Sequence, residues 1–145
     1  MGVAFYPVLN PAIVDYQPHL LVNGKAIAKA MPLLESWAKE VGVRPLYDFY
    51  SESTEEVFAK IGEPVPPGTK DEPIKWAEPD DGIKTVRAML ERLRSEPGPA
   101  LSVTDERGRE RSVSVEQLIR DLEAFESVFR RASDHGSKFR LRIDI

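Results

Sequence analysis

The sequence contains no cysteine and only two histidines among its 145 residues. The absence of thiols excludes a disulfide framework, iron–sulfur chemistry and thiolate-bound zinc. The two histidines, His19 and His135, lie far apart in the sequence and match no spacing that is typical of a metal site. We therefore predict a protein that holds no metal and no cofactor.

Long apolar runs and an excess of one charge are also missing. No stretch approaches the roughly 18–20 apolar residues that a membrane span requires. Residues 1–9 lack the basic segment of a signal peptide. The formal net charge of −4 gives no electrostatic drive toward nucleic acid, whose binders carry a concentrated positive surface. These absences predict a cytoplasmic protein that binds neither membrane nor nucleic acid.

The composition is that of an ordinary globular protein. With 41% hydrophobic and 30% charged residues, it excludes a disordered or fibrous chain. A chain of this length can bury about two-thirds of the surface that its unfolded state exposes. We expect one globular domain, residues 1–145, because neither half of the chain is large enough for an independent core.

Three segments carry the apolar periodicity of amphipathic helices. They are residues 25–41, residues 80–94 and residues 115–134. Pro32 interrupts the first segment, so that either the helix kinks there or a short turn precedes a helix that begins near Pro32. Ser114 and Gln117 fit a capping box at the start of the third segment.

Strand patterns lie at both ends of the chain. Residues 2–9 are rich in strand-favouring side chains, and Pro7 cannot donate to a ladder, so we expect it at an edge or bulge. Residues 139–145 alternate between apolar and polar side chains. Arg140 and Arg142 should therefore face out. The side chains expected to face the core are Phe139, Leu141 and Ile143.

Shorter elements are expected between these segments. Residues 101–105 and 109–113 could pair as a hairpin around a turn that contains glycine. Residues 46–50 could be a strand or a buried turn. Ser53 and Glu56 fit a capping box that begins a short helix. The whole pattern predicts an α+β fold, in which a small mixed or antiparallel sheet with the first and last strands is covered by three main amphipathic helices.

Residues 63–79 form an irregular, proline-rich segment, with five of the twelve prolines of the chain. A connection of this length is often functional, and its prolines reduce the entropy lost on ordering. Trp76 is of the type enriched at binding hot spots. We therefore expect the functional surface here. The alternative is that Trp76 packs back onto the helix 80–94.

An acidic group, Glu78, Asp80 and Asp81, adjoins Trp76 and completes the predicted binding surface. Paired carboxylates suit a metal ion or general acid chemistry. Carboxylates at a helix start also interact with its positive end, and this second interpretation is favoured.

The arginines of the chain allow two interpretations. Those in the hairpin and those near the end of the chain could each form an anion-binding patch. Solvated ion pairs are the commoner case, and Glu126 and Arg130 have the spacing of a helical pair.

Both ends of the chain resemble small bacterial proteins of the YfbM-like family. The similarity lies in residues 1–6, MGVAFY, and in residues 121–136, from Asp-Leu-Glu through Phe-Arg-Arg-Ala to glycine, followed by a final strand. The proline-rich middle departs from this pattern. The resemblance implies a bacterial protein and bears on the fold, but it implies no catalytic residue, because the family has no assigned activity to carry over.

The sequence lacks the Gly-x-Ser-x-Gly and His-Glu-x-x-His motifs. It therefore favours a non-enzymatic protein that acts through contact with a protein partner or through self-association, for example as a homodimer. The alternative is a small-molecule hydrolase or transferase that uses carboxylate, tyrosine and arginine side chains. A cleft lined by Asp80, Asp81 and an arginine would favour the enzyme, whereas a flat apolar patch around Trp76 would favour the interaction module.

Overall fold

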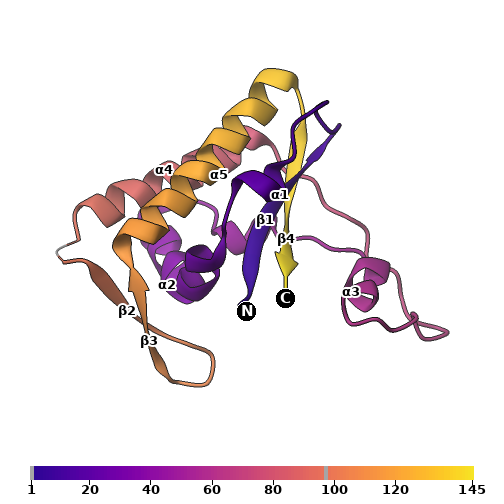
Figure 1. Cartoon of the computed structure of the whole chain (residues 1–145), viewed down its shortest axis with the longest axis horizontal. Coiled ribbons are helices and arrows are strands. Elements are labelled where there is room, and N and C mark those ends of the chain that lie inside the picture. Colours follow the sequence, from indigo (N-terminus) through magenta and orange to yellow (C-terminus); the bar gives the residue numbers. More distant parts are fainter. Residues whose placement is uncertain (1, 97) are drawn as a thin grey trace.

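Figure 1 shows the computed structural model of the chain, which describes residues 2–96 and 98–145. Within these residues it contains five α-helices, a 3-10 turn and two small antiparallel sheets, so the predicted α+β fold is confirmed. In chain order the elements are β1 (Ala4–Asn10), α1 (Pro18–Leu21), α2 (Lys25–Val41), η1 (Leu46–Phe49), α3 (Thr54–Lys60), α4 (Pro79–Arg94), β2 (Ala100–Thr104), β3 (Glu110–Ser114), α5 (Val115–His135) and β4 (Lys138–Asp144).

The first and last strands belong to one sheet, as predicted, and they pair with each other along their whole length. β1 and β4 are antiparallel, with Phe5 opposite Ile143. The N–H of Phe5 points away from β4, since it donates to the carbonyl of Gly24 at 3.3 Å. Because N–H directions alternate along a strand, Pro7 also lies on this outer edge, where its missing N–H costs no ladder bond.

The core lies between this sheet and the three long helices α2, α4 and α5, whose buried residues belong to one apolar cluster. Phe139 of β4 is fully buried at its centre. Its ring centroid lies 4.3 Å from that of Phe129 on α5 and 5.0 Å from that of Phe49 on η1. The amphipathic stripes in the sequence are therefore the faces that the three helices turn to the sheet.

The structure decides between the alternatives that the sequence leaves open. α2 is a single helix that contains Pro32 and ends at Gly42, which has a positive φ of 78°. Residues 46–49 form a 3-10 turn that buries Leu46 and Phe49 and leaves Tyr47 exposed, and Tyr50 then forms one bridge to Leu141. The expected hairpin is present as β2 and β3. α4 ends at Arg94. The sequence predicts that Pro97 and Gly98 stop this helix, and Pro97 lies outside the described residues.

One prediction about the last strand is wrong. Phe139 and Leu141 face the core as expected, and Ile143 is half-buried. Arg140, however, does not face solvent, because its side chain is only 7% exposed. Alternation places it on the outer face of the sheet, and that face is covered by α3 and the residues around it.

None of the helices in the described part of the chain combines the length and apolar character needed to cross a membrane.

We predict that Gly82→Ala destabilises the protein, although alanine is the better helix former. A Cβ at Gly82 would lie 2.8 Å from both the Phe129 and the Phe139 rings, where α4 approaches the core. Overpacking of this kind costs about 1–3 kcal/mol, against a gain in helix propensity of about 1 kcal/mol. Urea unfolding should therefore show a net loss of stability. Unchanged or increased stability would show that α4 can move away from these rings.

Candidate functional site

Residues 51–77 form an arm that leaves and rejoins the same edge of β4. The N–H of Ser51 donates to the carbonyl of Leu141 at 3.1 Å, while Ala77 and Phe139 exchange two backbone bonds of 2.7 and 3.0 Å. The N–H of Lys75 also donates to the Ser51 hydroxyl at 2.8 Å. Figure 1 shows α3 and its flanking loops on one side of the β1–β4 sheet and α2, α4 and α5 on the other.

Local hydrogen bonds fix the shape of the arm. The predicted capping box is present, because the Ser53 hydroxyl accepts from the N–H of Glu56 at 3.1 Å and the Glu56 carboxylate accepts from the N–H of Ser53 at 2.9 Å. The Thr54 hydroxyl donates to the Lys70 carbonyl and accepts from the N–H of Glu72, both at 3.1 Å. The proline-rich segment is therefore tied to the first turn of α3.

A cluster of charged side chains joins the arm to the outer face of β4. We call it the outer-face cluster; its members are Glu52, Glu56, Lys60, Arg140 and Arg142. The side chain of Glu52 is fully buried. It accepts from the Tyr50 hydroxyl at 2.9 Å and from Arg142 Nε at 2.9 Å, and it also pairs with Lys60.

Glu56 and Arg140 form the centre of this cluster. Two nitrogens of the Arg140 guanidinium donate to the two oxygens of Glu56 at 2.6 and 2.8 Å, and one of them also donates to the Ser51 carbonyl at 3.0 Å. Such a two-point pair fixes orientation as well as distance. The ring of Trp76 lies over the same guanidinium, with 5.2 Å from Cζ to the ring centroid.

Two side chains of this region keep one charge state at neutral pH, Glu56 as the carboxylate and Tyr50 as the neutral phenol. Hydrogen bonds from Arg140 lower the pKa of Glu56 to about 2. Burial and the hydrogen bond to Glu52 raise the pKa of Tyr50 to about 12. Burial alone would raise the pKa of Glu52, but the bonds from Lys60, Tyr50 and Arg142 lower it. A general acid or base works best with a pKa near the working pH. This arrangement therefore suits the attachment of the arm to β4 better than it suits proton transfer.

The sequence-predicted site residues do not form one site. Trp76 is half-buried on the arm, against Arg140 of β4. The three acidic residues turn to three separate partners: Glu78 lies 3.4 Å from Lys138, Asp81 lies 3.5 Å from Arg44, and Asp80 accepts from the Ser133 hydroxyl at 3.1 Å. Within residues 2–96 and 98–145, no three histidine or acidic side chains are grouped to hold a metal ion.

The arm presents apolar side chains that the fold does not use. α3 has no buried residue, and Val57 and Ile61 are 42% and 55% exposed. Val57 lies in α3 and Ile61 directly follows its last residue, Lys60. Their spacing of four residues places them on the same side, and we call this pair the apolar face of α3. Val65, further along the arm, is 37% exposed. The sequence predicts the functional surface at residues 63–79 and in the acidic group that follows. That prediction does not include Val57 and Ile61, although their four-residue spacing can be seen in the sequence.

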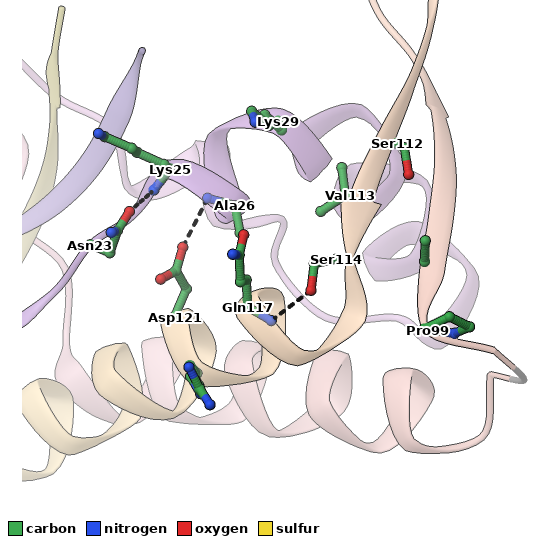
Figure 2. Close-up of a pocket in the computed structure, with 12 residues that line it drawn as sticks. Asn23, Lys25, Ala26, Lys29, Pro99, Ser112, Val113, Ser114, Gln117 and Asp121 are labelled. Carbon is green, nitrogen blue, oxygen red and sulfur yellow. Dashed lines mark hydrogen bonds between the residues drawn. The ribbon is translucent and has the colours of Figure 1, made fainter. Parts of the chain in front are cut away.

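A second feature is a groove of about 660 Å³, shown in Figure 2, which we call the α2–hairpin groove. It is lined by the start of α2, the base of the β2–β3 hairpin and the start of α5. On one side Asp121 of α5 is buried, and its carboxylate accepts from the N–H groups of Ala26 at 3.0 Å and Ile27 at 3.3 Å. Asp121 therefore caps α2 from a position more than ninety residues away in the sequence.

A third feature is an open groove of about 640 Å³ between α4 and α5. Asp80, Arg87 and Arg130 line it together. Both arginines are also held by Glu126, at 2.9 Å from Arg87 and 3.8 Å from Arg130, so the predicted pair of Glu126 and Arg130 is confirmed.

Comparison of the chain with protein-family models, with curated proteins and with solved structures finds no match. The resemblance to YfbM-like proteins stays a prediction.

We predict that Glu56 makes the protein lose stability in acid. Because its pKa falls from 4.5 to about 2 on folding, its contribution is complete above about pH 4.5 and is lost as the pH falls toward 2. Glu56→Gln removes this titration but keeps an oxygen for the capping box. Between about pH 5 and pH 2, the free energy of unfolding in urea should fall by about 1–3 kcal/mol less in this variant than in the wild type.

The matched control for this measurement is Glu55→Gln, which changes the exposed neighbouring carboxylate on α3. It should keep the acid dependence of the wild type. An acid dependence in Glu56→Gln as steep as in the wild type would contradict the pairing of Glu56 with Arg140.

Proposed function

We propose that the protein is a non-enzymatic interaction module, in which the arm binds a second copy of the chain. The observation that carries this proposal is the apolar face of α3, Val57 and Ile61, which is exposed on an element with no buried residue of its own. Apolar side chains that serve no core are available for contact with another protein.

The way the arm is held supports the proposal. α3 has seven residues, and an isolated helix of that length is unstable in water. Its order must therefore come from further contacts, among them the capping box, the bonds of Thr54 to the proline-rich segment and the outer-face cluster. Because the arm is ordered before contact, less entropy is lost on binding.

The charges of the arm suit a second copy as the partner. Its exposed acidic residues include Glu55 and Glu63, and its exposed basic residues include Lys70 and Lys75. In a two-fold contact each partner supplies the same patch, so a patch with both signs of charge can pair with itself. The exposed apolar side chains are few, and we expect a weak, concentration-dependent dimer in the smallest class of interfaces.

A second candidate function is a small-molecule hydrolase or transferase. The observation that favours it is the groove between α4 and α5, where Asp80 lies with Arg87 and Arg130. Against it, Asp81, the other carboxylate expected in such a cleft, turns to Arg44. The outer-face cluster and the adjoining Tyr50 bring tyrosine, arginine and carboxylate groups together, but these side chains are engaged with one another in ion pairs and hydrogen bonds.

We predict that Val57→Ser/Ile61→Ser weakens self-association while the monomer keeps its thermal unfolding midpoint, because both side chains are exposed and neither belongs to the core. Sedimentation velocity over a concentration series up to about 1 mM, where weak dimers form, measures the association. The matched control is Val14→Ser/Leu20→Ser, which removes two apolar side chains that are 85% and 71% exposed outside the arm.

The control variant should associate like the wild type. A wild-type chain that is monomeric throughout the series would contradict the proposal. Equal weakening in both variants would place the contact outside the arm.

A further inference from the structure

The α2–hairpin groove carries an unbalanced positive charge. Lys25 and Lys29 line it from one side of α2, and Arg120 lines it from α5. Arg120 is paired with Glu116 at 2.5 Å. Among residues 2–96 and 98–145, no carboxylate oxygen lies within 4.0 Å of the amine of Lys25 or Lys29.

Lys25 stands at an unfavourable place in its helix. It is the first residue of α2, a helix of seventeen residues with no acidic residue in its first turn, and Lys29 follows one turn later on the same side. The start of a helix carries a partial positive charge, so cations there oppose the macrodipole. Local rules of this kind are broken mainly at functional sites, where a bound group compensates.

The carboxylate of Asp121 does not balance this charge. Its side chain is turned to the N–H groups of Ala26 and Ile27, and the residue is only 5% exposed. Burial raises the pKa of Asp121, against the effect of these bonds. The negative partner of Lys25 and Lys29 is therefore not supplied by the groove itself.

What distinguishes the two lysines is that they share one groove of an acidic protein. The protein is acidic overall, with a formal net charge of −4. Most arginines in the described residues form ion pairs, for example Arg44, Arg92 and Arg94. Within the described part of the chain, other exposed lysines, for example Lys39 and Lys84, also form no ion pair, but Lys25 and Lys29 lie together on the lining of one groove.

We propose that the α2–hairpin groove binds a small molecule that carries an oxyanion, either a phosphate or a carboxylate. Lys25 and Lys29 would hold the oxyanion, and the polar side chains of the groove would contact the rest of the ligand. The volume of about 660 Å³ lies within the range of small-molecule sites.

Figure 2 shows how these polar groups lie. Gln117 projects from α5 toward Ala26, between Asp121 and Ser114, and Ser112 faces the groove region from the hairpin. In this view the Lys25 side chain extends away from Asp121 and from the hairpin. A lysine has a flexible four-carbon stem, so its amine can reorient toward an anion in the groove.

The test is a titration of the whole chain at pH 7, followed by the backbone amide signals in two-dimensional NMR. Sodium phosphate is one probe and sodium citrate the other, each at constant ionic strength maintained with sodium chloride. We expect saturable shifts confined to residues 23–29, 99–100 and 112–121. If only phosphate gives saturable shifts, the groove is a phosphate site. If only citrate gives them, it is a carboxylate site, and if both probes do, it is a general oxyanion site.

The variant Lys25→Gln/Lys29→Gln should weaken binding at least tenfold. Lys39→Gln/Lys84→Gln is the matched control, because it removes the same charge from two exposed helix lysines outside the groove. Its affinity should stay within about threefold of the wild type, as expected for distant charges screened by salt. Shifts that do not saturate, that spread over the surface, or that weaken equally in both variants would overturn the proposal.

Discussion

The pairing of Arg140 and Arg142 on β4 with Glu52 and Glu56 on the arm is the interaction on which the rest of the outer face depends. α3 is short and has no buried residue, so packing into the core cannot order it. A buried ion pair is weak evidence for net stability, because desolvation offsets the Coulomb attraction. Its effect here is on geometry, since the two-point bond of Arg140 to Glu56 and the burial of Glu52 fix where the arm stands.

The two faces of the β1–β4 sheet thus serve different purposes. The inner face, centred on Phe139 and Leu141, supplies the apolar core under α2, α4 and α5. On the outer face, ion pairs hold the arm against β4, and the apolar side chains of the arm remain exposed for contact with another protein. The α2–hairpin groove is a separate feature, built where the starts of α2 and α5 meet the hairpin. Self-association through the arm and ligand binding in the groove therefore rest on different residues and can be tested independently.

Much of the fold could be predicted because its signals are local. The alternation in residues 139–145 placed Leu141 in the core, and the capping box at Ser53 placed the start of α3. The same local signals could not show which segment covers the outer face of β4. Arg140 is buried by Glu56, which lies more than eighty residues away in the sequence. Asp121 likewise caps a helix from a distant segment. The candidate sites arise from these long-range contacts, which one sequence does not reveal.

The most direct test of whether the outer-face cluster holds the arm is amide hydrogen exchange in Arg140→Met. The control is Arg130→Met, which removes a solvent-exposed arginine. Amides in α3 should exchange at least tenfold faster in Arg140→Met, because local opening of the arm becomes easier. Amides in the centre of α5 should change much less, which separates this effect from global unfolding. Unchanged protection of α3 in Arg140→Met would contradict the claim that the outer-face cluster holds the arm.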